Sequence, residues 1–143
     1  MRTPAFLLFL FQAFTVITLP VCSQTRPGAT TGEWKAPSFA DTLTDTGPAD
    51  AKMPEKGRLQ FVQLCVPCHG DQGKGDGIAG IELNPKPGDL SSAKVQGQKD
   101  GALFWKISKG RGAMAAYEKQ LTAVQRWALV HYIRHLAATT RKK

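Results

Sequence analysis

The sequence predicts an all-α fold with about three to four helices joined by long loops. Apolar residues recur at helical spacing in three segments of the chain, and no segment shows the apolar–polar alternation that is typical of a strand. The loops between these segments are rich in glycine and proline. Because three helices give only a small hydrophobic core for residues 54–143, we expect another group to fill the centre of this domain.

The first predicted helix covers about residues 54–64. Pro54 and Glu55 suit its first turn, because proline already has the φ of a helix and a carboxylate interacts favourably with the helix dipole. A short helix is predicted over about residues 100–109, and residues 110–120 are expected to be irregular.

The last predicted helix follows Thr122, which is expected to be its N-cap, and ends near Thr139. Six apolar residues follow helical spacing along it. They are Val124, Trp127, Leu129, Tyr132, Ile133 and Leu136.

Between the first and second helices lies Cys65-Val66-Pro67-Cys68-His69, which has the C-x-x-C-H spacing of a c-type haem attachment site. Two thiols at this spacing can each form a thioether to the edge of one haem, and the adjacent imidazole can bind the iron from one face. We therefore expect one covalently bound haem c, held by Cys65 and Cys68, with His69 as an iron ligand. A haem would also fill the centre of a domain with so few helices.

Two other roles for Cys65 and Cys68 stay open. A C-x-x-C pair can be a thiol–disulfide redox site, although such sites are expected near a βαβ pattern, which the flanking sequence lacks. A zinc site would need a second pair of ligands, which His131 and His135 can supply at helical i, i+4 spacing.

The N-terminal segment has the features of a secretory signal. Residues 5–21 are almost entirely apolar (AFLLFLFQAFTVITLPV) and follow Arg2. We predict a signal peptide over residues 1–23 and export to the bacterial periplasm, where c-type haem is attached. Two alternatives place the protein on the membrane: the apolar segment stays uncleaved as an anchor, or Cys22 carries a lipid.

Residues 24–53 are rich in Thr, Pro, Gly, Ala and Asp and have no periodicity, so we interpret them as a flexible linker. The aromatic residues of this segment, Trp34 and Phe39, are expected to pin it to the surface of the domain formed by residues 54–143.

The basic residues are concentrated in residues 54–143, which carry fifteen Lys and Arg against seven Asp and Glu, a net charge of +8, whereas residues 24–53 have a net charge of −1. An exported protein rarely meets nucleic acid, so we expect no nucleic-acid partner. The charge favours a redox partner protein with an acidic docking surface, because complementary charge speeds encounter. A surface charged only for solubility is the alternative.

Gly57 and Phe61 stand eight and four residues before Cys65, and Leu129 and Tyr132 lie in the last predicted helix. Between them the chain contains, in order, Cys68-His69-Gly70, Gly73-x-Gly75-Asp76-Gly77, Pro85-x-Pro87-x-Asp89-Leu90, Asp100-Gly101 and Phe104-Trp105-x-Ile107. In this order and spacing the motifs resemble those of class I cytochromes c, specifically bacterial monohaem c-type cytochromes. The resemblance implies the cytochrome c fold, in which long loops wrap around one haem and the first and last helices cross at the glycine.

The family also implies a second axial ligand, a methionine sulfur from the loop before the last helix, and Met114 lies in that loop. The family usually has proline after this methionine. Here the residue is Ala115, so we expect a less rigid loop and an iron–sulfur bond that is easier to displace. Ligation by His131 or His135 is the alternative, although each is expected to lie on the surface.

The resemblance implies two further sets of contacts. A backbone carbonyl among residues 85–88 is expected to accept a hydrogen bond from the ring of His69, which would fix the orientation of that ring. Trp105 and Arg111 are candidates for contacts with the haem propionates, or else ordinary core and surface residues.

These features predict an electron carrier rather than an enzyme, because an iron with both His69 and Met114 bound has no vacant position for a substrate. We predict a periplasmic protein that cycles between Fe(II) and Fe(III). Candidates for its docking rim are Lys74, Lys86, Lys106, Lys109 and Arg111.

Two alternative functions stay open. In the first, the chain is a membrane-tethered cytochrome c subunit of a respiratory or dehydrogenase complex. In the second, it is a gas- or peroxide-binding haem protein in which Met114 is a labile ligand.

Overall fold

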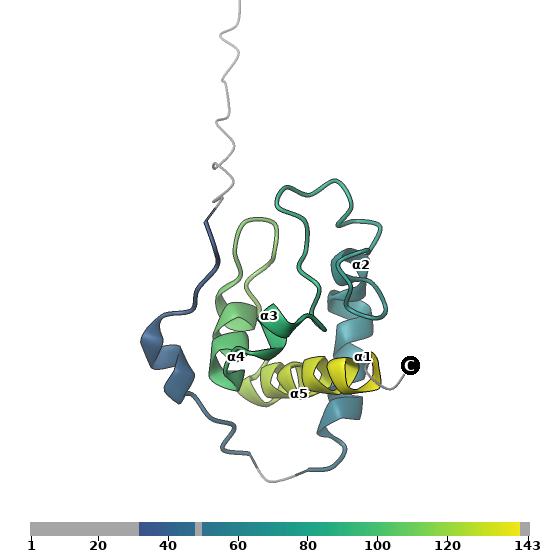
Figure 1. The fold of residues 1–143 in the computed structure, drawn as a ribbon. Helices are drawn as coiled ribbons and strands as arrows, with labels where there is room; N and C mark the ends of the chain where they lie inside the picture. The colour runs from purple at the N-terminus through teal and green to yellow at the C-terminus, as the bar shows by residue number, and fades with distance from the viewer. Residues whose placement is uncertain (1–31, 48–49, 141–143) are drawn as a thin grey trace, which may run out of the picture.

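The computed structural model describes residues 32–47 and 50–140, and within these ranges the regular structure is helical (Figure 1). The elements in chain order are the 3-10 helix η1 (Ser38–Thr42) and the α-helices α1 (Met53–Leu64), α2 (Val66–His69), α3 (Ala93–Gln96), α4 (Asp100–Lys109) and α5 (Ala123–Thr140). The described residues contain no strand, and one isolated bridge joins Arg111 and Met114. The predicted all-α class is confirmed.

The crossing of α1 and α5 is the centre of the fold (Figure 1). Gly57 lies buried at this crossing, where a Cβ atom would overlap the carbonyl group of Ala128. One turn later, the ring of Phe61 is fully buried and its centroid lies 5.1 Å from that of Tyr132. The predicted close approach at Gly57 is therefore confirmed.

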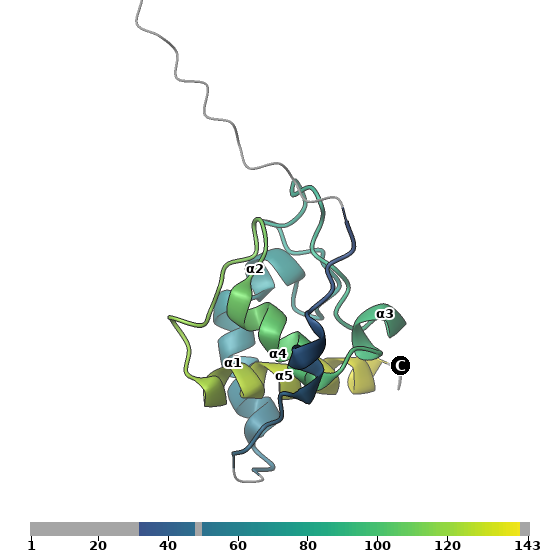
Figure 2. The same cartoon turned by 90° about the vertical axis from the view of Figure 1, so that its left-hand side faces the viewer.

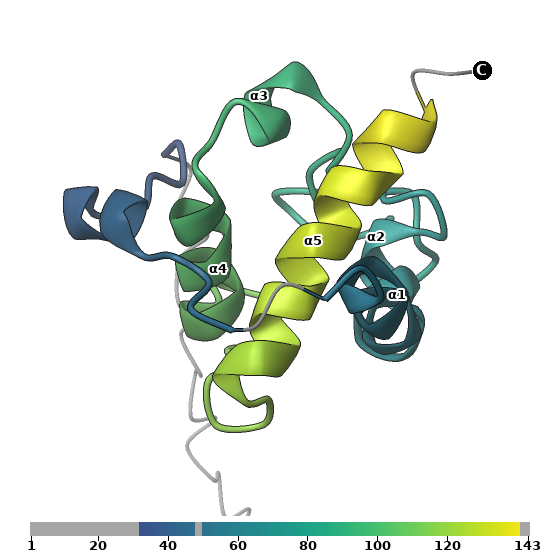
Figure 3. The ribbon, with the colours of Figure 1, turned by 90° about the horizontal axis from the view of Figure 1, so that it is seen from below.

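Helix α4 packs on the side of α5 opposite α1, so that α1 and α4 flank α5 (Figure 3). The rings of Phe104 and Trp127 stack at this contact, with their centroids 4.4 Å apart. The guanidinium of Arg126 lies 4.7 Å from the centroid of the Phe104 ring, and Arg126 is itself buried. This cluster joins α4 to the first half of α5.

The predicted helix boundaries agree with the structure to within one residue. At the start of α5, the hydroxyl of Thr122 accepts a hydrogen bond from the N–H of Gln125 (3.3 Å), and the Gln125 side chain accepts one from the N–H of Thr122 (2.8 Å). The short elements η1, α2 and α3 were not predicted, because segments of four or five residues are too short to show a hydrophobic period.

Residues 32–47, which the sequence assigns to a flexible linker, pack along α4 (Figure 2). Ala40 of η1 is fully buried, and its carbonyl group lies against Gly101 of α4, where no side chain intervenes. Trp34 contacts the domain as predicted, but the prediction for Phe39 is wrong, because this residue remains 59% exposed. We call residues 32–47 the arm.

The predicted signal peptide, residues 1–23, and its alternatives at Cys22 lie outside the described residues. Within residues 32–47 and 50–140, no helix has the length and apolar character needed to cross a membrane.

Candidate haem site

The cysteine motif forms a single helical turn at the end of α1. The N–H groups of Cys68 and His69 both point to the carbonyl of Cys65, at 3.1 and 2.7 Å. Residues three and four positions apart share one face of a helix, so the two thiols and the imidazole emerge on the same face of this turn. Both thiols are free and partly buried.

The environment of Cys65 does not suit thiol–disulfide catalysis. Burial raises the pKa of the Cys65 thiol to about 12, so the thiol stays protonated at neutral pH. A redox dithiol needs the opposite, a thiolate stabilised by a lowered pKa. The burial of Cys65 therefore disfavours this residue as the reactive thiol of a redox pair.

His69 is oriented by a backbone carbonyl. Its Nδ1 atom lies 3.4 Å from the carbonyl oxygen of Gly88, which belongs to the predicted segment of residues 85–88. Burial lowers the pKa of His69, so the ring is held in the neutral form that binds a metal. A proton on Nδ1, donated to Gly88, leaves the Nε2 lone pair available for iron.

Gly88 is in turn held by contacts to the loop that follows His69. The N–H of Leu90 donates to the carbonyl of Gly73 (2.7 Å), and the Lys74 ammonium bonds the hydroxyl of Ser91 and lies 3.4 Å from the Asp89 carboxylate. These bonds join residues 73–74 of that loop to residues 89–91, which directly follow Gly88.

Met114 lies in a tight turn before α5. Arg111 and Met114 exchange two backbone hydrogen bonds, of 2.9 and 3.0 Å, and the partly buried Met114 packs against the core. The hydroxyl of Tyr117 donates to the carbonyl of Leu64 at 3.2 Å, immediately before Cys65. The turn is thus tied to the end of α1 that carries the cysteine motif.

The residues fit a c-type haem. The donors are two free thiols, a neutral imidazole and a thioether, which are the groups that attach and ligate this cofactor. Several apolar side chains pack against the core without being fully buried, as expected where a further apolar group completes the packing. They include Val66, Leu90, Phe104, Met114 and Tyr117.

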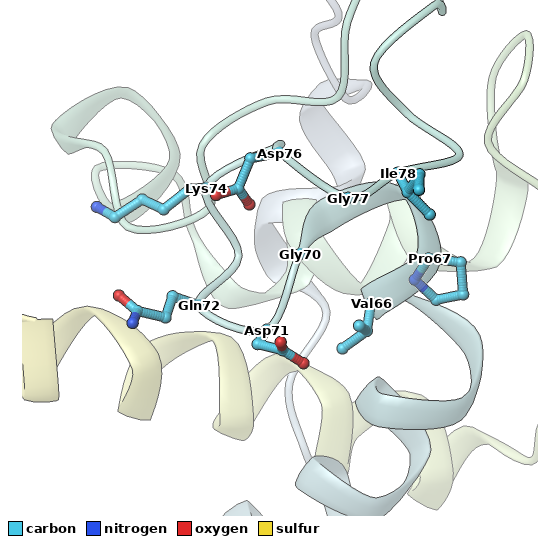
Figure 4. Close-up of a pocket in the computed structure, with 9 residues that line it drawn as sticks. All are labelled: Val66, Pro67, Gly70, Asp71, Gln72, Lys74, Asp76, Gly77 and Ile78. Carbon is cyan, nitrogen blue, oxygen red and sulfur yellow. The ribbon is translucent and has the colours of Figure 1, made fainter.

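A separate cavity of about 490 Å³ lies beside α2 (Figure 4). Val66, Pro67 and Ile78 line it together with polar residues of the following loop, and none of Cys65, Cys68, His69 or Met114 does.

Two alternatives assigned metal ligation to His131 and His135 of α5, either in a zinc site or as a second iron ligand, and both lack structural support. Nε2 of His131 lies 3.0 Å from the Asp45 carboxylate of the arm, and the exposed His135 stacks on Tyr132. In the described part of the chain, no group of three or more His, Cys, Asp or Glu side chains is arranged to hold a metal ion. Neither a zinc site with the cysteine pair nor a second histidine ligand is favoured.

The two residues considered for propionate contacts lie in different surroundings. Trp105 is half-buried on α4. Arg111 donates to the carbonyl of Gly32 in the arm (2.7 Å) and lies over the ring of Trp34. Sequence reasoning missed this contact, because no local pattern links residues that are 79 positions apart.

Comparisons with known proteins agree with the resemblance to cytochromes c. Residues 52–133 match the family described as "Cytochrome C oxidase, cbb3-type, subunit III". The chain is 37% identical over 82 residues to the Cbb3-type cytochrome c oxidase subunit FixP of Bradyrhizobium diazoefficiens, covering 57% of this chain and 27% of that protein. It is 31% identical over 88 residues to the Cbb3-type cytochrome c oxidase subunit CcoP of Azospirillum brasilense, covering 61% of this chain and 30% of that protein.

The chain thus spans less than a third of the length of these curated relatives. Among solved structures, a chain of the Kuenenia stuttgartiensis reducing HAO-like protein complex Kustc0457/Kustc0458 has a similar fold, with a TM-score of 0.56 and 24% identity. The match covers 66% of this chain and 49% of that one.

Proposed function

This chain belongs to the family of the cytochrome c oxidase cbb3-type subunit III, which matches residues 52–133, and we propose that it carries electrons as a membrane-tethered subunit of a respiratory complex. It is a class I cytochrome c, and its redox group is a covalently bound haem c. A domain of this kind acts as an electron carrier.

The relatives favour the tethered subunit over the freely soluble periplasmic carrier that the sequence first suggested. Both curated relatives are named as subunits of an oxidase. In this chain the tether would be the apolar segment of residues 5–21 or a lipid on Cys22, with the domain of residues 54–143 in the periplasm. The arm would then lead from the tether to α4.

We assign one haem to this chain, because Cys65 and Cys68 form the one C-x-x-C pair in the sequence. The haem, when bound, supplies a one-electron Fe(II)/Fe(III) couple. Cys65 and Cys68 attach it, His69 and Met114 ligate the iron, and the Gly88 carbonyl holds the His69 ring in one orientation.

One observation carries the proposal. A single helical turn places Cys65, Cys68 and His69 on one face, and the hydroxyl of Tyr117 ties the Met114 turn to the same end of α1. These contacts support a single haem site that combines attachment by the two cysteines with ligation by His69 and Met114.

Absorption spectra of the haem-loaded protein in both oxidation states test the ligand set. We expect the ferric form to show the weak far-red sulfur-to-iron band, and Met114→Ala to lose it and become high-spin. Met53→Leu, a change to the buried methionine that begins α1, is the control and should keep the band. A high-spin wild type without the band would overturn His/Met ligation and favour a gas- or peroxide-binding site.

Membrane fractionation tests the tether. We expect the haem-stained full-length chain to sediment with membranes and to resist a salt wash. Release of Cys22→Ser into the soluble fraction would identify a lipid as the tether, whereas retention would identify the uncleaved apolar segment. A wild-type chain found in the soluble periplasmic fraction would contradict membrane attachment.

A further inference from the structure

The N-terminal end of the arm lies against three basic side chains that come from three different segments. They are Lys94 of α3, Lys106 of α4 and Arg111 of the Met114 turn, and we call them the cationic face. The arm approaches α4 from the side opposite α1 and runs toward the end of the molecule where the long loops lie (Figures 1 and 2).

Glu33 and Trp34 supply the contacts from the arm. A Glu33 carboxylate oxygen lies 3.3 Å from the Lys94 ammonium, which lowers the pKa of Glu33. The Trp34 ring is shared by two cations, with Lys106 Nζ 5.4 Å and Arg111 Cζ 6.0 Å from its centroid. One carboxylate and one aromatic ring thus engage all three basic residues.

A competing ligand can displace Glu33 and Trp34 from these contacts. The side chains of Lys94 and Glu33 are 73% and 50% exposed, and ion pairs between exposed groups contribute little to stability. By contrast, η1 is held firmly, because Ala40 is fully buried against α4. Residues 33 and 34 can therefore leave the cationic face while the rest of the arm stays attached.

Lys106 lies close enough to Lys94 and Arg111 for their positive charges to act on it. Burial lowers the pKa of Lys106; Glu33 opposes this, and the nearby Lys94 and Arg111 add to it. A carboxylate of a partner protein would oppose the positive charge around Lys106 in the same way as Glu33 does.

The cationic face includes a residue of the turn that carries Met114, the proposed iron ligand. Arg111 belongs to the turn that it closes with Met114 through two backbone hydrogen bonds. A protein that docks on Arg111 therefore lies against the turn of the proposed iron ligand.

We infer that the cationic face is the docking surface for a redox partner with clustered carboxylates, and that Glu33 and Trp34 occupy it in competition with that partner. This inference rests on the proposed function, because it assumes that the chain exchanges electrons with another protein. Displacement of residues 33 and 34 exposes the three cations to the partner.

The first test is the oxidation of the ferrous holoprotein by ferricyanide, a multivalent anion, followed by stopped flow. One electron passes from the ferrous haem to ferricyanide, which leaves ferric haem and ferrocyanide. We expect Glu33→Gln and Trp34→Ala to raise the second-order rate constant by about threefold or more at low salt, and the gain to vanish near 0.5 M salt, where screening is roughly complete.

Two matched controls separate competition from a change in net charge or arm composition. Asp41→Asn removes the same charge from an exposed residue of the arm that forms no ion pair among the described residues. Phe39→Ala removes an exposed aromatic ring from the same arm. Both controls are expected to react like the wild type, apart from the small effect of one charge.

The second test locates anion binding without electron transfer. Hexacyanochromate(III), a paramagnetic anion, is added to the ferrous protein, and the broadening of amide signals is measured by NMR. We expect broadening at Lys94, Lys106 and Arg111 that is about threefold stronger in Trp34→Ala than in Phe39→Ala.

Equal rates in Glu33→Gln and Asp41→Asn, or broadening centred on Lys74 and Lys86 instead, would overturn the inference. A ferrous holoprotein that does not reduce ferricyanide would count against the proposed function, and the NMR titration would still decide whether anions bind the cationic face.

Discussion

The backbone of Gly57 lies against the carbonyl group of Ala128 where α1 crosses α5. A methyl group at position 57 would overlap this carbonyl and would come within 2.8 Å of the Cβ atom of Tyr132. The helices cannot separate freely, because Phe61 and Leu129 are almost completely buried beside the crossing. This contact therefore sets where the end of α1, and with it Cys65, lies relative to α5.

Gly57→Ala is expected to lower the free energy of unfolding by about 2 kcal/mol or more, because overpacking must push two helices apart. Guanidinium denaturation of the haem-loaded ferric protein measures this change. Gly32→Ala is the control, since no heavy atom lies within 4 Å of the added methyl group, and its cost should be within about 0.5 kcal/mol. Equal stability of the two variants would contradict the close approach.

Tyr117→Phe is expected to loosen the Met114 turn, because it removes the hydrogen bond from the tyrosine hydroxyl to the Leu64 carbonyl. The loss should be about 1 kcal/mol of stability, together with faster binding of carbon monoxide or imidazole in place of Met114. Ligand-binding kinetics of the holoprotein measure the second effect. Tyr132→Phe makes the same change in the core on α5, and an equal increase in its binding rate would argue against the role of the Tyr117 bond.

Arg126→Ala is expected to destabilise the fold by about 2 kcal/mol, because the buried guanidinium packs on Phe104 and bonds the hydroxyl of Ser108. Arg126→Lys should recover only part of this loss, since an ammonium lacks the planar surface that stacks on a ring. Thermal unfolding of the holoprotein measures both changes. Arg58→Ala, which breaks an exposed pair with Glu55, is the control and should leave the unfolding temperature nearly unchanged.

The Asp89 carboxylate is expected to make the stability of the folded protein depend on pH. Its carboxylate accepts hydrogen bonds from the hydroxyl and the N–H of Ser91, at 2.7 and 2.8 Å, and lies near the Lys74 ammonium. These contacts, the Ser91 hydroxyl foremost, hold the pKa of Asp89 below its ordinary value of 3.8. Between the folded pKa and 3.8, the unfolded chain therefore binds more protons at this carboxyl than the folded protein does. The stabilisation is complete above pH 3.8, and it is lost as the pH falls through the folded pKa.

Asp89→Asn should lower the stability of the holoprotein by about 0.5 kcal/mol at neutral pH, a small effect because the group is partly exposed and screened. The wild-type and variant stabilities should converge as the solution is made more acidic than pH 3.8. Urea denaturation across this pH range measures the difference. A gap that stays constant at every pH would refute the assignment to the Asp89 carboxylate.

The main helices and the cysteine motif could be predicted from the sequence, because their causes are local. The proline near the start of α1, the apolar spacing of α4 and the Thr122 cap each act within a few residues. The attachment motif is also local, since Cys65 and Cys68 must reach one haem edge from a single turn. The crossing at Gly57 and the carbonyl acceptor for His69 followed from the family resemblance.

The placement of the arm was decided only by the tertiary structure. The composition of residues 24–53 predicted a flexible linker. In the structure, however, η1 packs on α4, because Ala40 is fully buried and its carbonyl group contacts Gly101, which has no side chain. Trp34 and Phe39 are equivalent in a one-dimensional pattern, but only Trp34 meets cations, which come from Lys106 and Arg111. Local patterns specify elements through short-range forces, whereas the contacts between distant segments depend on which surfaces the folded helices bring together.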